Sequence, residues 1–102
     1  MKPPYLQVIA HYFAKPGQSE RVLTLLDALA RATRDEPKNL DYQFFRSPHD
    51  PDHFVILEQY TDATGLDEHR QTPHFQQIGY GQIIPMLERR DVRSHMVHGA
   101  SQ

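Results

Sequence analysis

The pattern of hydrophobic and polar positions divides the chain into segments with the two-residue period of a strand or the 3.6-residue period of a helix. Residues 6–13 are rich in β-branched and aromatic side chains, which predicts a strand. A Pro-Gly pair follows, and apolar residues then recur at i, i+3, i+4 and i+7, which predicts a helix over residues 18–35. Residues 40–47 and 53–60 flank a turn rich in proline and aspartate, so they predict a hairpin of two strands.

The second half predicts two further helices and a last strand. Thr61 or Asp62 is expected to cap a helix that ends near Arg70, and Thr72 before a proline starts another that contains glycines. Residues 92–98 predict the last strand. The order is that of a ferredoxin-like βαββαβ fold, an α+β class with helices on one face of an antiparallel sheet. We expect a single domain over residues 1–102, with its core at 6–98 and a flexible tail at 99–102.

Neither face of the predicted sheet is cleanly polar. Ile9 and Phe13 lie opposite Val8 in the first strand. In the second strand, alternation assigns one face to Leu40, Tyr42, Phe44 and Arg46. An uncovered apolar sheet face predicts a partner, and a homodimer that packs sheet against sheet is the simplest one.

Composition and charge exclude several classes of protein. The chain has 102 residues, of which 38% are hydrophobic and 24% charged, as in a folded soluble protein. Its formal charge of −2 gives no basic footprint, so we expect no nucleic-acid partner. The absence of cysteine excludes disulfides, thiolate zinc sites and a cysteine nucleophile. No signal peptide and no apolar run of about 18 residues is visible, so we expect no membrane contact and a cytoplasmic location.

Neither a metal site nor a bound cofactor is expected. The chain has seven histidines, but His69 and His74 lie across a helix break, and no other pair has convincing ligand spacing. The glycines at positions 79 and 81 lack the third glycine and the preceding strand of a dinucleotide-binding motif.

His69 and Glu58 are the candidate catalytic residues. His69 is expected to act as a general base or hydrogen-bond donor, or else to be a structural histidine bound to Glu58 or a backbone carbonyl. Glu58 stands among apolar neighbours of its strand, where a carboxylate needs a partner. It is expected to act as a base or to orient a histidine, or else to form an ion pair with Arg46 or Arg70.

Five further residues are candidates for substrate binding. Tyr42, Phe44 and Tyr60 could line a flat aromatic-binding cavity, or they could be sheet core. His11 could add a polar group to that cavity or lie in a dimer interface. His74 could be a second polar group of the cavity, or an exposed residue after its proline.

Several stretches of the chain form a recognisable set: Ala-Lys-Pro-Gly at 14–17, Thr-Arg-Asp-Glu-Pro at 33–37, Glu-x-Tyr at 58–60, and His69 followed by Thr-Pro-His-Phe at 72–75. Together they resemble the antibiotic biosynthesis monooxygenase family over about residues 6–87. The resemblance implies a dimeric α/β barrel, with a cavity between the sheet and helices of each subunit. It also implies action on quinols and polycyclic phenols without metal or flavin. Where the family often has Glu-Pro-Gly, this chain has Lys38, so Asn39 is expected to take the left-handed conformation.

Oxygen chemistry without a cofactor constrains the mechanism. Triplet oxygen reacts slowly with closed-shell molecules, so the substrate itself must donate an electron, best as the anion of a quinol, anthrone or enol. The protein would supply a base (His69, tuned by Glu58), a slot for a flat ring and exclusion of water. The sequence therefore predicts a cofactor-independent monooxygenase that acts on a small aromatic or quinol-type substrate and O2.

Three alternatives remain open. The first is an isomerase-like or binding protein of the same fold for a small polar metabolite. The second is a haem-binding or haem-degrading relative, in which Tyr60 would replace the missing tryptophan. The third is a dimeric domain whose cavity serves assembly only.

Overall fold

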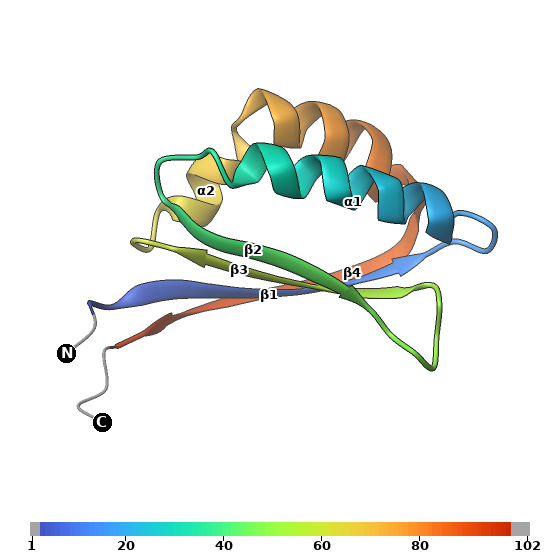
Figure 1. The fold of residues 1–102 in the computed structure, drawn as a ribbon, viewed down its shortest axis with the longest axis horizontal. Helices are drawn as coiled ribbons and strands as arrows, with labels where there is room; N and C mark the ends of the chain where they lie inside the picture. Colours follow the sequence, from blue (N-terminus) through green and yellow to red (C-terminus); the bar gives the residue numbers. More distant parts are fainter. Residues whose placement is uncertain (1–2, 99–102) are drawn as a thin grey trace.

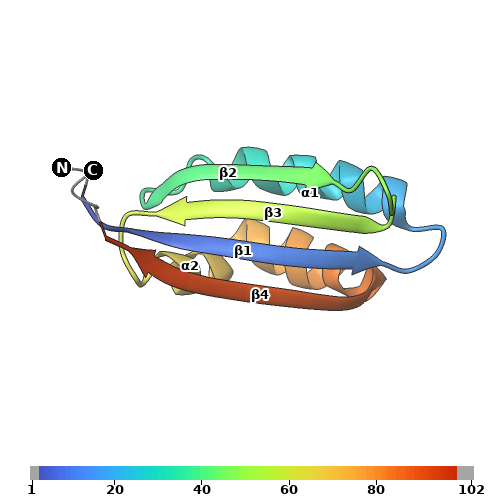
Figure 2. The ribbon, with the colours of Figure 1, turned by 90° about the horizontal axis from the view of Figure 1, so that it is seen from below.

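One antiparallel sheet with helices on a single face forms the fold. A computed structural model describes residues 3–98. The elements are β1 (Tyr5–Ala14), α1 (Ser19–Thr33), β2 (Asn39–Arg46), β3 (His53–Tyr60), α2 (Gly65–Arg70), η1 (Phe75–Ile83), η2 (Ile84–Met86) and β4 (Leu87–Val97). The strands lie in the order β2-β3-β1-β4. All helices cover one face (Figure 1), and the other face is bare within the chain (Figure 2).

Strict alternation in β1 and β3 builds the core. Every second side chain of both strands is buried against the helices, among them Val8 and Phe54. The apolar stripe of α1 packs on this surface, with Val22, Leu26 and Leu29 fully buried. Each such leucine contributes roughly 1.5–3 kcal/mol relative to an exposed one. The ferredoxin-like α+β prediction is confirmed, with an open sheet and not a closed barrel in the single chain.

The last strand is longer than the sequence predicts. β4 begins at Leu87 and not at residue 92, because Leu87 and the charged residues 89–91 pair with β1 along the sheet edge, with a register shift that leaves Glu88 without a partner. Edge strands commonly carry charged side chains that face solvent, so the missing apolar alternation concealed this strand. The predicted tail at 99–102 lies outside the described residues.

A register shift in β2 overturns the predicted face of Leu40. The pairing with β3 shifts between Asn39 and Asp41, so one extra residue is inserted there. Tyr42 and Phe44 face the helices, whereas Leu40 is 55% exposed. Asn39 lies in the strand, and no non-glycine residue among 3–98 has a positive φ, so the predicted left-handed conformation is wrong.

Two glycines allow close packing around the helices. α2 begins at Gly65, later than predicted, and a Cβ there would lie 2.3 Å from the Cβ of Tyr60. The helix after Thr72 forms as a π-helix, in which a Cβ at Gly79 would lie 2.9 Å from the ring of Phe75. Thr72 is the predicted start signal, and its Oγ1 accepts a hydrogen bond from the Phe75 amide at 3.2 Å.

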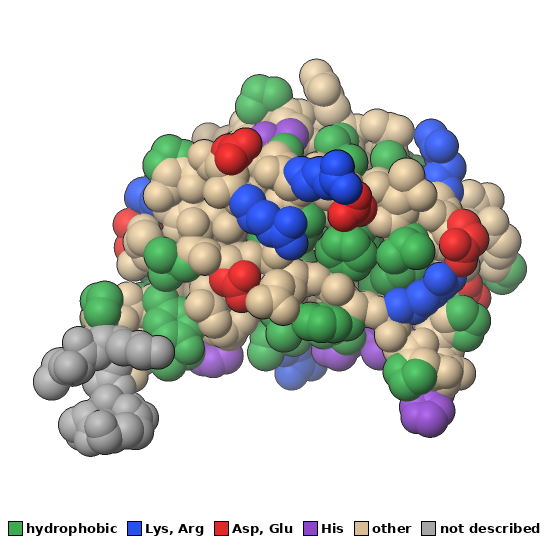
Figure 3. All heavy atoms as spheres, in the orientation of Figure 1, with side chains coloured by type: hydrophobic (Ala, Val, Ile, Leu, Met, Phe, Trp, Pro, Cys, Tyr) green, Lys and Arg blue, Asp and Glu red, His purple; other side chains and the backbone are tan. Residues whose placement is uncertain are grey.

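Charges on the surface are mixed in sign. Figure 3 shows basic and acidic side chains interspersed over one face of the molecule. Lys38, the residue that departs from the family pattern, joins the start of β2 to α2 through Asp62 at 3.1 Å and Glu68 at 2.6 Å. Within residues 3–98, no helix is both long and apolar enough to cross a membrane.

Candidate active site

Two histidines converge on one carboxylate oxygen between α1, α2 and η1. His69 Nδ1 lies 2.7 Å from Glu36 Oε2, and His74 Nε2 lies 2.6 Å from the same atom. Glu36 stands in the turn after α1, where its amide donates to the Thr33 carbonyl at 2.9 Å and Pro37 prevents further helix. Thr72 fixes the turn after α2 by donating from Oγ1 to the His69 carbonyl at 2.7 Å.

The Glu36 contact determines which nitrogen of His69 carries a proton. Burial opposes ionisation of Glu36, but the hydrogen bonds from His69 and His74 outweigh it and lower the pKa of this carboxyl. An ionised carboxylate only accepts, so the imidazole of His69 donates from Nδ1, and in the neutral form of the ring the lone pair is on Nε2. That nitrogen lies 3.8 Å from Glu58 Oε1, and the His69 side chain is 2% exposed. Glu36, which sequence reasoning missed, therefore orients the histidine in place of Glu58.

Glu58 is a buried carboxyl on the helix-facing side of β3. Its Oε1 accepts a hydrogen bond from the Tyr60 hydroxyl at 2.5 Å. Burial raises the pKa of Glu58, and the nearby His69 and the Tyr60 hydrogen bond only partly oppose that rise. The predicted alternative partner Arg46 instead forms an ion pair with Glu20 at 2.7 Å. A proton-accepting nitrogen and a carboxyl with a raised pKa thus lie side by side.

A small cavity lies beside these two groups. Its volume is about 10 Å³, enough for one water molecule and too small for an aromatic ring. Tyr42 lines it, Tyr60 reaches Glu58 through its hydroxyl, and Phe44 packs elsewhere on the core. The lining residues that sequence reasoning did not assign to a cavity are Ala10, Tyr12, Leu66, Arg70, Phe75, Arg90 and Val92.

Aromatic rings enclose His69. The centroid of Phe75 lies 4.7 Å from that of the imidazole, with Tyr60 at 6.0 Å and Tyr42 at 6.2 Å. Burial raises the pKa of the Tyr42 and Tyr60 hydroxyls, and the charge of Glu58 adds to the rise. Both phenols therefore remain protonated hydrogen-bond donors at neutral pH.

His74 connects the cluster to solvent. Its side chain is 22% exposed, so it is neither fully exposed nor inside the small cavity. It faces a shallow groove of about 440 Å³ on the outer side of Glu36. The groove is lined by Ala32, Asp35, Glu36, Pro37, Thr72, Pro73 and His74.

The structure places His11 apart from the other candidates. It belongs to the bare face of β1, opposite the face that carries Glu58. Its Nδ1 lies 2.9 Å from His53 Nε2, and the His53 ring stacks on Phe13 at 4.4 Å. This position is compatible with the alternative that His11 lies in an interface.

The structure brings together a possible set of metal ligands that sequence spacing did not suggest. One ligand atom from each of Glu36, His69 and His74 lies within 4.8 Å of the others. Two ligands of one tetrahedral zinc ion lie about 3.3 Å apart, since zinc–ligand bonds are about 2.0–2.1 Å. The contacts of 2.6 and 2.7 Å are shorter and have the length of hydrogen bonds with protons between the atoms. In this arrangement the cluster is an acid–base group.

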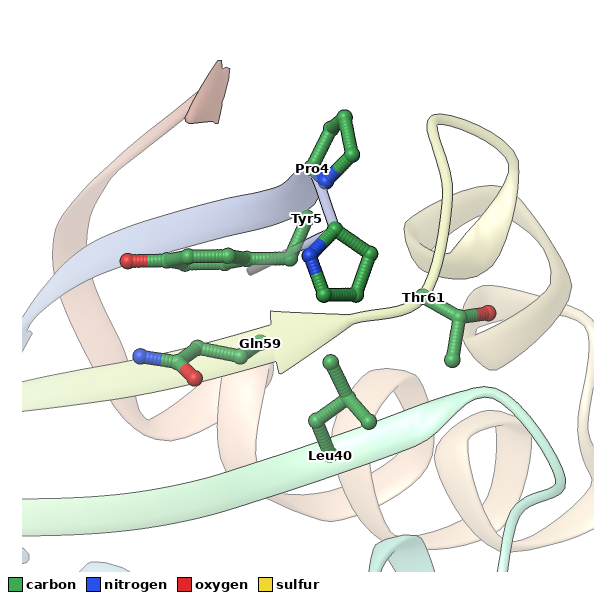
Figure 4. Close-up of a pocket in the computed structure, with 6 residues that line it drawn as sticks. Pro4, Tyr5, Leu40, Gln59 and Thr61 are labelled. Atoms are coloured by element: carbon green, nitrogen blue, oxygen red, sulfur yellow. The ribbon is translucent and has the colours of Figure 1, made fainter. Parts of the chain in front are cut away.

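A second hollow lies at one end of the bare sheet face. Figure 4 shows the Tyr5 ring, Gln59 and Leu40 around this space of about 380 Å³. Tyr5 is its one titratable side chain among the described residues, so it has no acid–base pair. The candidate active site is therefore the cavity beside His69 and Glu58.

The family follows from a match that covers most of the fold. A family model described as antibiotic biosynthesis monooxygenase matches residues 6–79. The chain belongs to this family. A Mycobacterium tuberculosis protein named "Putative monooxygenase Rv0793" is 35% identical over 68 residues, which span 67% of this chain and 66% of that protein. The matched stretch is thus just under two thirds of this relative.

Solved structures of similar chains share the whole fold. A crystal structure titled as an antibiotic biosynthesis monooxygenase has 35% identity and a TM-score of 0.80, covering 93% of this chain and 98% of that one. PA3566 from Pseudomonas aeruginosa has 30% identity and a TM-score of 0.79, covering 99% and 98%. Membership in this family supports a monooxygenase-like function.

Proposed function

We propose that this protein is a cofactor-independent monooxygenase that oxidises a small aromatic or quinol-type substrate with O2. The observation that carries the proposal is the orientation of His69. Its Nδ1 faces Glu36 at 2.7 Å, so the free lone pair of Nε2 lies beside Glu58 in a small cavity. A carboxylate that holds one imidazole nitrogen makes the other nitrogen a general base.

The proposed reaction needs no external reductant. For an anthrone, the CH2 group becomes C=O, one oxygen atom enters the substrate, and the other leaves as water. The base first removes a proton from the substrate. The resulting anion gives one electron to O2, and the two radicals join as a peroxide on carbon. Loss of water then forms the ketone, so the four electrons taken up by O2 all come from the substrate.

Each polar group has a role in this scheme. His69 Nε2 accepts the substrate proton, and Glu36 stabilises the imidazolium that forms. Glu58, with its raised pKa, is suited to return a proton when water leaves. The cavity of about 10 Å³ must widen to admit a ring, and Leu66 and Arg70 on the short helix α2 are among the residues that would have to move.

We also propose that two copies pack through their bare sheet faces. This face carries apolar side chains such as Ile9 and Val55, and Phe45 is 51% exposed. An apolar sheet face of this kind favours a symmetric partner. A dimer mass in solution that becomes a monomer in Phe45→Asp would support this packing, and a wild-type monomer at micromolar concentration would refute it.

Oxygen consumption tests the proposed reaction. Metal-stripped protein is given a panel of hydroquinones and anthrones, with His69→Ala and the exposed turn variant His49→Ala beside wild type. We expect uptake above the uncatalysed rate in wild type and His49→Ala, and its loss in His69→Ala. Uptake unchanged in His69→Ala would remove the base from the mechanism, and no uptake by wild type would refute the oxygenase function.

The size of the cavity favours one other function. A space of about 10 Å³ beside two acid–base groups also suits proton transfer on a small polar metabolite without oxygen. In that case the protein would catalyse exchange of substrate C–H for deuterium from solvent with no oxygen uptake.

A further inference from the structure

Two arginines reach the candidate active-site cavity from different elements. Arg70 is the last residue of α2, and Arg90 lies on the edge strand β4. Both line the cavity together with Glu58 and His69. Arg70 is half-buried and Arg90 is exposed, so both lining residues are accessible to solvent.

Neither arginine is paired with a carboxylate. Among residues 3–98, no Asp or Glu oxygen lies within 4.0 Å of the Arg70 or Arg90 guanidinium, although Arg31, Arg46 and Arg93 all have such partners. The Arg90 guanidinium lies 5.9 Å from the centre of the Tyr80 ring, at the outer limit of a cation–π contact. The Tyr12 hydroxyl is a neutral hydrogen-bond partner of Arg90 and leaves its charge in place. Two guanidinium groups without a carboxylate partner at one cavity form a place where a negative charge is stabilised.

We propose that the substrate of this site is an aromatic compound that carries an anionic group, and that Arg70 and Arg90 receive this group. The inference rests on the proposed function, because it names the substrate class of the same cavity. The arginines are the solvent-accessible charged residues of the lining and His69 is buried, so the anionic group would lie near solvent and the ring would point inward toward His69. A planar guanidinium binds a carboxylate through two parallel hydrogen bonds, which gives orientation as well as affinity.

The chemistry of the cavity agrees with this assignment. Burial raises the pKa of Glu58, although the charge of Arg70 partly opposes this rise. The raised pKa reduces the tendency of this carboxyl to ionise and to offset the positive charge of the arginines. Deprotonation by His69 makes the substrate more negative, and nearby guanidinium groups stabilise that charge as it develops. The arginines would thus act as specificity residues before the reaction and as electrostatic support during it.

A matched pair of ligands tests the inference by binding alone. Hydroquinone and 2,5-dihydroxybenzoate differ by one carboxylate, and their dissociation constants are measured by calorimetry without oxygen. We expect wild type to bind the carboxylate about tenfold more tightly, as charge-assisted hydrogen bonds imply. In Arg70→Gln, Arg90→Gln and the double variant this ratio falls toward one, and it falls in wild type as salt is raised.

Arg21→Gln is the matched control. Arg21 is exposed on α1, away from the bare sheet face, and among residues 3–98 it has no carboxylate partner and does not line the cavity. This variant should keep the wild-type ratio. A ratio near one in wild type, a ratio unchanged in the double variant, or no binding of either ligand would overturn the inference.

Failure of the inference is distinguishable from failure of the proposed function. Oxygen uptake with hydroquinone and no preference for the carboxylate would leave the oxygenase function standing and remove the arginines from recognition. Tight, arginine-dependent binding of the carboxylate without oxygen uptake would support the inference and refute the oxygenase function.

Discussion

Replacing Glu36 with glutamine perturbs the centre of the site with almost no change of shape. In the wild type, one oxygen of Glu36 accepts hydrogen bonds of 2.7 Å from His69 and 2.6 Å from His74. Bonds to a charged group contribute about 1.5–3 kcal/mol each, and neutral ones about 0.5–1.5 kcal/mol. When the charge of Glu36 is removed, each of the two hydrogen bonds changes from a charged to a neutral one, and the fold loses about 2 kcal/mol of stability in total. Little solvent screening reduces this figure, because the Glu36 side chain is only 9% exposed. For a domain of this size the loss corresponds to roughly 8–16 °C in Tm.

The loss of stability in Glu36→Gln is expected to depend on pH. The pKa of Glu36 is lowered from its ordinary value of 4.5, so its ionised form stabilises the fold above that pH. This stabilisation is lost as pH falls through the lower pKa of the folded state. The difference between wild type and Glu36→Gln should therefore persist from pH 7 to about pH 5 and shrink under more acid conditions.

Urea unfolding between pH 3.5 and pH 7.5 measures this difference. Asp35→Asn is the matched control, because the Asp35 side chain is exposed and makes no hydrogen bond or ion pair with residues 3–98. We expect the control to follow wild type throughout. Equal stability of Glu36→Gln and wild type at pH 7, or a difference that does not change with pH, would refute the assignment of an ionised Glu36.

Three further changes test the site and the core. Glu58→Gln should raise the urea midpoint at pH 8 and have no effect at pH 4, because the raised pKa of Glu58 makes its ionised form destabilising; a lower midpoint at pH 8 would contradict this. Gly65→Ala should cost about 1–3 kcal/mol by overpacking against Tyr60, and an unchanged thermal midpoint would show that α2 shifts freely. Leu26→Ala should cost about 2–5 kcal/mol in denaturant unfolding, and a loss under 1 kcal/mol would place Leu26 outside the core.

The periodicity of hydrophobic residues predicted the strands and the helix that bury one face and expose the other. β1, β3 and α1 each bury one regular set of positions, so their hydrophobic patterns indicate both type and approximate extent. The start of β4 could not be found in this way, because the exposed charged residues 88–90 show no apolar alternation, although 89 and 90 pair with β1. Nor does alternation locate the register shift in β2, which places Leu40 on the other face.

The candidate site was predicted in part. Sequence reasoning named His69 and Glu58, and the structure places their side chains 3.8 Å apart. It missed Glu36 because the contact with His69 spans 33 positions and depends on how the turn after α1 meets α2. The available signal was the resemblance itself, which includes the Glu-Pro pair of that turn. Arg70 and Arg90 were missed as lining residues because their convergence depends on tertiary packing.

The tautomer of His69 tests the central claim most directly. Long-range ¹H–¹⁵N NMR on the labelled protein at pH 7 distinguishes a protonated imidazole nitrogen from an unprotonated one. The hydrogen bond to Glu36 predicts a protonated Nδ1 and an unprotonated Nε2, with the pattern altered in Glu36→Gln. A protonated Nε2 with a free Nδ1 in the wild type would leave the cavity without its base and contradict the account.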